Sequence, residues 1–157
     1  MNQEASRSLS HAAPAILFAG LACGVMDLTA ALVTWGLKGV RPERLLQGIA
    51  TGLLGERSFA GGWETAALGG ACHFFIAFSA ATVFYLASRR IAWLTDRPLL
   101  SGPLYGIAVY VVMYWIVVPL SAAGPRPFAW SATLLAIVTH IVCVGSPIAL
   151  VVSRYSR

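Results

Sequence analysis

The run PLLSGPLYGIAVYVVMYWIVVPLSA, residues 98–122, contains no charged residue, and it decides the fold. An α-helix rises about 1.5 Å per residue, so roughly 20 apolar residues cross the ~30 Å hydrocarbon core of a bilayer. The run is therefore long enough for one crossing. Three further apolar blocks of similar length cover residues 14–37, 64–88 and 129–152. The sequence thus predicts four membrane-spanning helices.

The composition of the whole chain is that of a membrane protein. Of its 157 residues, 58% are apolar and only 11% are charged, and the mean hydropathy is +0.75. Soluble domains have about 25% charged residues. Because the predicted spans take up most of the chain, we expect a single transmembrane domain over residues 1–157, an all-α four-helix bundle in contact with the lipid bilayer.

The net charge of +5 predicts topology rather than binding to nucleic acid. The two tails and the loop at 88–98 hold six basic residues: Arg7, Arg89, Arg90, Arg97, Arg154 and Arg157. The connections on the other side hold five: Lys38, Arg41, Arg44, Arg57 and Arg126. Since cytoplasmic loops are enriched in Lys and Arg, we expect both termini in the cytoplasm.

The connection between the first two spans predicts a short amphipathic helix over residues 42–56. On a helical wheel one face carries Leu45, Leu46, Ile49 and Leu53. The other face carries Arg44, Gln47, Thr51 and Gly55. Pro42 suits a first helical turn. We expect this helix to lie at the membrane interface, with a lid over the bundle as the functional alternative.

Three stretches resemble a family of small, uncharacterised bacterial inner-membrane proteins with four spans. They are RLLQGIATGLLG (44–55), GPLYGIAVYVVMYWIVVPLSA (102–122) and HIVCVGSPIAL (140–150). The resemblance implies a location in the bacterial inner (cytoplasmic) membrane. It also points to Asp27, His73 and His140, which match an Asp in span one and a His in spans two and four. In that family an Asn often follows the Met of span three, whereas here Tyr114 follows Met113.

Ionisable side chains lie inside the predicted spans, where a charged residue at the helix centre costs about 2.5–3.5 kcal/mol even on insertion-based scales. With alternating helix directions, Asp27, His73 and His140 fall within roughly 5 Å of the bilayer midplane. Tyr105 and Tyr110 add hydroxyl groups from span three. We therefore predict that these five residues form a polar cluster that is the functional centre of the protein.

Two interpretations of this cluster concern polar chemistry alone. In the structural one, an Asp–His hydrogen bond holds the helices together, at a typical value of about 0.6–2 kcal/mol in a membrane. In the functional one, the cluster binds or transfers a proton, an ion or a small molecule, because intramembrane Asp and His typically mark such paths. The functional interpretation is the one that we expect, in a homo-oligomer or a larger assembly.

Two further interpretations involve a cofactor or a partner. His73 and His140 are candidate axial ligands of a haem b between spans two and four, and the same histidines with Cys23 and Cys143 are candidate metal ligands. Alternatively, the protein is an accessory subunit of a larger membrane complex. The sequence has no nucleophile elbow, phosphate loop or HExxH motif, which disfavours an enzyme, and we predict no catalytic residue.

Overall fold

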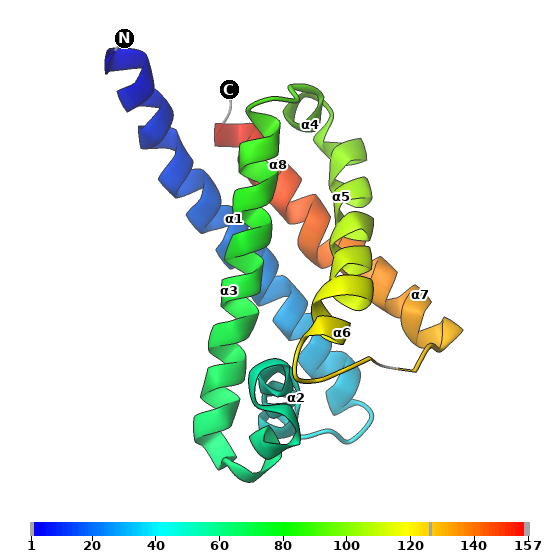
Figure 1. The fold of residues 1–157 in the computed structure, drawn as a ribbon. Helices are drawn as coiled ribbons and strands as arrows, with labels where there is room; N and C mark the ends of the chain where they lie inside the picture. The colour runs from blue at the N-terminus through cyan, green and yellow to red at the C-terminus, as the bar shows by residue number, and fades with distance from the viewer. Residues whose placement is uncertain (1, 126, 156–157) are drawn as a thin grey trace.

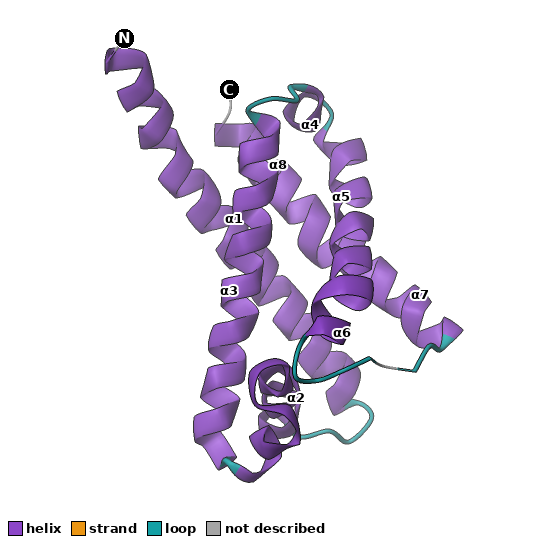
Figure 2. Cartoon of the chain, viewed as in Figure 1, coloured by secondary structure: helices purple, strands orange, loops and turns teal. Residues whose placement is uncertain are grey.

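The computed structural model describes residues 2–125 and 127–155, and the described side chains begin at Ala12. Figure 1 shows long helical segments packed against one another, and Figure 2 shows that helix dominates the described chain. The segments long and apolar enough to cross a membrane are Ala12–Gly36, Gly62–Ser88, Pro98–Leu120 and Trp130–Tyr155. The four predicted spans are therefore confirmed, each boundary to within three residues. Arg126 and Arg157, counted above for topology, lie outside the described residues.

The spans alternate in direction along the chain (Figure 1). Span one is α1 (Asn2–Gly36) and span two is α3 (Gly62–Ser88). Span three comprises α5 (Pro98–Val112), the π-helical segment η2 (Met113–Val117) and α6 (Val118–Leu120). Span four comprises α7 (Trp130–Thr139), the π-helical segment η3 (His140–Gly145) and α8 (Ser146–Tyr155). The short helix α4 (Trp93–Asp96) connects spans two and three.

The two ends of the bundle differ. One end carries both chain termini and α4, and we call it the terminal end; the opposite end carries α2 (Pro42–Leu54), and we call it the α2 end (Figure 1). The buried core lies toward the terminal end, where α1, α3 and α8 meet, and it is rich in small residues such as Ala15, Ala19, Ala81 and Ala149. Small residues let helix backbones approach closely, which favours association in lipid.

Each π-helical segment is separated from a following proline by a single residue, since η2 precedes Pro119 and η3 precedes Pro147. Proline has no N–H for the carbonyl four residues earlier, and its ring clashes with that carbonyl. The backbone then adopts the wider hydrogen-bond pattern of a π-bulge. In span four the Ser146 N–H bonds the Ile141 carbonyl, five residues earlier, and the Ser146 hydroxyl donates to the same oxygen at 2.7 Å.

Spans three and four touch backbone to backbone. Gly102 and Gly106 of α5 face Gly145 of η3, and a Cβ on Gly145 would overlap the backbone of both. A Cβ on Gly106 would likewise overlap the carbonyl of His140. The absence of side chains at these three positions is what permits the contact.

The predicted helix between spans one and two is confirmed as α2, which ends where Gly55 adopts a positive φ of 58°. The 3₁₀ turn η1 (Gly55–Ala60) leads from it into α3. α2 crosses α3 at Gly69, where a Cβ would overlap the Leu46 carbonyl. Its far side is held by the Ala122 N–H, which donates to the Gly52 carbonyl at 3.0 Å.

Two polar side chains of α2, Gln47 and Thr51, pack on the protein. Gln47 is 3% exposed and Thr51 is 7% exposed, whereas Leu53 is 63% exposed. The Gln47 Nε2 donates to the Gly62 carbonyl at 3.0 Å, and the Thr51 hydroxyl donates to the Gly48 carbonyl at 2.7 Å. The buried side of α2 therefore consists of Gln47, Ala50 and Thr51, whereas Arg44, from the predicted polar face, and Leu53, from the predicted apolar face, are both exposed.

Candidate functional site

Asp27 lies on α1 where this helix packs against η3. Its side chain is half-buried, and its charge interacts with the thiols of Cys23, one turn earlier on α1, and of Cys143 on η3. Cys23 is buried and Cys143 is half-buried. Cys23 shares the α1 helix with Asp27, and Cys143 belongs to the span that α1 packs against at η3.

Tyr105 of α5 extends this group to a third span. Its hydroxyl donates to the Ala80 carbonyl on α3 at 2.7 Å, and its side chain interacts electrostatically with Cys23. The Cys23 thiol in turn donates to the Ala77 carbonyl on α3, with the sulfur 3.9 Å from the oxygen. Both hydrogen bonds join different helices, so they contribute to the packing of the bundle.

His73 of α3 faces α1 next to this group. Its Nε2 lies 2.9 Å from the Gly24 carbonyl, which belongs to the residue after Cys23. A carbonyl oxygen only accepts hydrogen bonds, so Nε2 carries the hydrogen and, in the neutral ring, Nδ1 keeps a lone pair. At the same residue of α1, a Cβ on Gly24 would collide with the ring of Phe74, the neighbour of His73.

His140 lies at the start of η3 and faces a different neighbour. Its Nδ1 donates to the Ala136 carbonyl at 2.8 Å, within its own span. Its ring meets the ring of Tyr110 edge-on, with the centroids 5.6 Å apart. Tyr110 is buried and stacks on Tyr114, with the centroids 5.6 Å apart. His140 and Tyr110 therefore belong to an aromatic group between spans three and four.

The five residues of the predicted cluster thus separate into two groups. The first contains Asp27, His73 and Tyr105, together with Cys23 and Cys143, and each of the four spans contributes to it. The second contains His140 and Tyr110. Across the described residues, no hydrogen bond or ion pair joins any two of the three residues Asp27, His73 and His140. The depth of each residue in its span, from which the cluster was predicted, does not separate these two groups.

The histidines do not present a matched pair of ligands. His73 is hydrogen-bonded to α1 through Nε2, whereas His140 stands against Tyr110 of α5. In the part of the chain that the structure describes, no group of three or more His, Cys, Asp and Glu side chains is arranged to hold a metal ion. Haem or metal binding by His73, His140, Cys23 and Cys143 therefore gains no support from the geometry.

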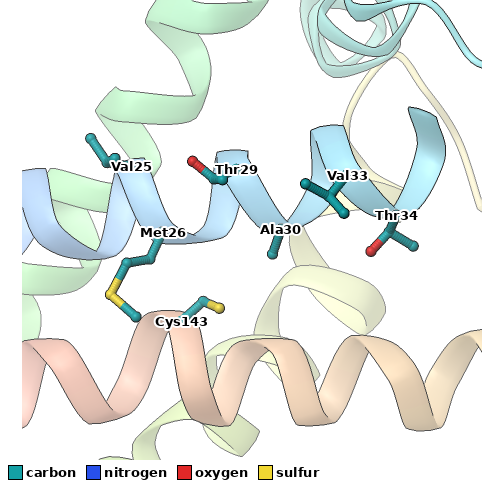
Figure 3. A pocket seen from close by; sticks show the side chains of 7 residues that line it. All are labelled: Val25, Met26, Thr29, Ala30, Val33, Thr34 and Cys143. Atoms are coloured by element: carbon teal, nitrogen blue, oxygen red, sulfur yellow. The ribbon is translucent and has the colours of Figure 1, made fainter. Parts of the chain in front are cut away.

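A groove of about 510 Å³ lies between α1 and η3 (Figure 3). Six lining residues come from α1, between Val25 and Thr34, and Cys143 completes the lining. Figure 3 shows Met26, Ala30 and Thr34 pointing toward span four and Cys143 pointing toward α1. The sequence did not predict this groove, although the four-residue spacing of Met26, Ala30 and Thr34 places these residues on one helix face.

Comparisons with known proteins do not assign the chain to a family. No family model matches the chain, and no curated protein and no solved structure matches it significantly. The resemblance to bacterial inner-membrane proteins therefore stays a prediction. The structure establishes a multi-pass membrane protein with four spans.

Proposed function

We propose that this membrane protein binds and releases a proton at Asp27. The observation that carries the proposal is the position of Asp27, an ionisable side chain that lies half-buried inside a membrane span. An ionised Asp at the centre of a span costs about 2.5–3.5 kcal/mol on insertion-based scales. A proton neutralises the carboxylate and removes this cost.

The neighbours of Asp27 favour a proton over a hard metal cation. Ca²⁺ takes six to eight oxygen ligands, and Mg²⁺ requires an octahedral shell of oxygen atoms. The group around Asp27 instead offers the thiols of Cys23 and Cys143 and, next to Cys23, the Tyr105 hydroxyl, which is already bonded to a carbonyl. A single carboxyl group with so few oxygen atoms around it can bind a proton but does not provide the oxygen shell of a Ca²⁺ or Mg²⁺ ion.

His73 is the second titratable group in the proposal. It is fixed to Gly24, one turn before Asp27 on α1, through Nε2, so that Nδ1 keeps a lone pair in the neutral ring. Its bond to α1 also makes His73 an interhelical contact, so a variant at this position tests packing as well as proton exchange.

The proposal includes an orientation and a location. The basic residues of the tails and of the 88–98 loop outnumber those of the α2 end by six to five, which supports termini in the cytoplasm of a bacterial inner membrane. Two reporters fused to the C-terminus test the orientation: an enzyme active only in the cytoplasm and an enzyme active only outside it. Activity of the second reporter alone would contradict the proposed orientation.

Proton flux into proteoliposomes tests the function. Vesicles carry an internal pH-sensitive dye, and a potassium diffusion potential, negative inside, drives proton entry. We expect wild-type vesicles to acidify faster than empty ones, and Asp27→Asn to abolish the difference. Asp96→Asn is the matched control because Asp96 lies in α4, outside the spans, and it is expected to behave as wild type. Equal flux in wild type and Asp27→Asn would contradict transfer through Asp27.

Infrared spectroscopy tests binding separately from transfer. A protonated Asp has a carboxylic C=O stretching band that the ionised form lacks. We expect a pH difference spectrum of the wild type to contain such a band, and the spectrum of Asp27→Asn to lack it, with Asp96→Asn again as control. A band that persists unchanged in Asp27→Asn would assign the titrating group elsewhere.

A further inference from the structure

α2 packs on span two close to His73. α3 begins at the α2 end with Gly62, and α2 crosses it at Gly69, one helical turn before His73 (Figure 1). The Nε2 of His73 is bonded to the Gly24 carbonyl of α1, one turn before Asp27. Along α3, α2 therefore lies between the membrane surface at the α2 end and the residues of the proposed proton site.

α2 also joins span two to span three at this end of the bundle. Tyr105 of span three bonds the Ala80 carbonyl of α3, in the half of α3 that lies toward the terminal end. At the α2 end, α2 packs on α3 at Gly69, and its Gly52 carbonyl accepts a hydrogen bond from the Ala122 N–H just after span three. A movement of α2 would therefore release a contact between these two spans without changing the bond from Tyr105.

The docking of α2 buries little apolar surface. Its buried residues are Gln47, Ala50 and Thr51, and none of them belongs to the hydrophobic core that α1, α3 and α8 share. The large side chains of Leu53 and Leu54 are 63% and 40% exposed. Elements with few buried apolar contacts open at a lower free-energy cost than the core of a fold. α2 can therefore leave its position while the core stays packed.

The chain has a glycine with positive φ on each side of α2. Gly39, in the turn that follows α1, has a φ of 81°, and Gly55, directly after α2, has a φ of 58°. Glycine adopts both signs of φ at little cost, and the hinges of moving segments are a few such positions that absorb changes in φ and ψ. Both connections of α2 therefore contain a position at which the chain can bend.

We propose that α2 is a lid that controls access of protons to Asp27 and His73 from the α2 end. In the closed state, seen in this structure, α2 rests on Gly69 and the Gly52 carbonyl is bonded to Ala122. In the open state this bond is broken and α2 has moved away from α3, while the four spans keep their packing. The lid rests on the proposed function, because it concerns the regulation of the same site.

A disulfide between α2 and the end of span three tests the lid in the complete chain. A Cβ on Gly52 would lie 3.9 Å from the Cβ of Ser121, within the range of about 3.5–4.5 Å found in disulfides. We expect the Gly52→Cys/Ser121→Cys protein to transfer protons when reduced and to fall to the level of empty vesicles when oxidised. Gly52→Cys alone, treated with the same oxidant, is the matched control and should be unaffected. Equal flux in the oxidised and reduced double variant would show that α2 is a fixed brace.

A second measurement does not depend on proton flux. Diethyl pyrocarbonate modifies an unprotonated imidazole nitrogen, and His73 has such a lone pair at Nδ1. In the same double variant we expect His73 to be modified severalfold more slowly in the oxidised form than in the reduced form. His140, which lies against Tyr110, should react equally in both forms, and mass spectrometry of peptides gives the rates.

The two measurements separate the lid from the proposed function. Equal modification of His73 in the two forms would overturn the lid. Absence of flux in the wild type, together with slower modification of His73 in the oxidised form, would contradict proton transfer and support the lid.

A variant that loosens α2 tests the lid without new cysteines. Gln47→Ala removes the bond from Nε2 to the Gly62 carbonyl. We expect faster hydrogen–deuterium exchange in α2 and faster modification of His73, with little change in the unfolding temperature, because the hydrophobic core contains no residue of α2. Leu53→Ala, at an exposed position of the same helix, is the control and should change neither rate. A lower unfolding temperature of Gln47→Ala with unchanged exchange and modification would assign α2 to stability alone and overturn the lid.

Discussion

Gly106 of α5 lies so close to His140 of η3 that a methyl group on Gly106 would overlap the His140 carbonyl. The contact joins the two spans that contain π-helical segments, and it occurs at the residue where η3 begins. The position of the His140 ring beside Tyr110 therefore depends on a glycine one helical turn away from that tyrosine.

We expect Gly106→Ala to destabilise the bundle, since the added methyl group forces the two spans apart. Overpacking of this kind typically costs about 1–3 kcal/mol. Gly70→Ala is the matched control, because nothing lies within 4 Å of a Cβ at this helical position, and there the change to Ala should be neutral or stabilising by about 0.5–1 kcal/mol. Thermal unfolding of both variants in the same detergent checks the prediction. A Gly106→Ala protein that unfolds at or above the wild-type temperature would contradict the contact.

The two histidines should differ in their effect on stability. His73 bonds a carbonyl on another span, so His73→Leu should cost about 0.6–2 kcal/mol, and His73→Gln, which keeps an N–H donor, should cost less. The Nδ1 bond of His140 is to its own span, so His140→Leu removes no hydrogen bond between spans and should cost less than His73→Leu. Thermal unfolding of the variants in detergent at fixed pH gives the order of their stabilities. A larger loss of stability in His140→Leu than in His73→Leu would contradict the assignment of the bond between spans to His73.

Two fully buried serines provide a further comparison. Within the described chain the Ser58 hydroxyl is 0% exposed and has no hydrogen-bond partner, whereas the Ser101 hydroxyl, on a residue 1% exposed, donates to the Leu94 carbonyl at 2.6 Å. A buried polar group without a partner costs about 1–3 kcal/mol. Ser58→Ala should therefore leave the unfolding temperature unchanged or raise it, and Ser101→Ala should lower it. Destabilisation by both changes to the same extent would show that the Ser58 hydroxyl has a partner.

The three cysteines predict an order of chemical labelling. Cys23 is 1% exposed, whereas Cys143 lines the groove. In a Cys72→Ser protein in detergent, a small maleimide should modify Cys143 well before Cys23. Mass spectrometry of peptides over time gives the two rates. Equal rates would mean that α1 and η3 separate readily, which would contradict their packing around Asp27.

The spans could be predicted from the sequence because they depend on composition alone. An uncharged run such as residues 98–122 needs no knowledge of its neighbours to be recognised as a span. The contacts between side chains depend on helix rotation, which hydropathy does not determine. The depth of Asp27 and His140 along their spans could therefore be predicted, but not that the His140 ring faces Tyr110 of span three.

The orientation of α2 shows a second limit of the sequence. The alternation of polar and apolar residues in α2 predicts a helix, and the helix is present. Gln47 is buried because its side chain donates to the Gly62 carbonyl and because Gly69 lets α2 approach the backbone of α3. Gly62 and Gly69 lie outside α2, so the pattern of residues within α2 does not predict which of its side chains are buried.

The contacts of α2 also have a consequence for biogenesis. α2 has a small contact with α1, but most of its packing is against α3, and its bond to Ala122 is formed with a turn that also follows it in the chain. During synthesis α2 therefore leaves the ribosome before α3 and Ala122 exist, and it docks on α3 only after span two is in place. The bond from Ala122 to Gly52 forms later still, once span three has been made. The α2 end is thus completed only after three of the four spans have been synthesised.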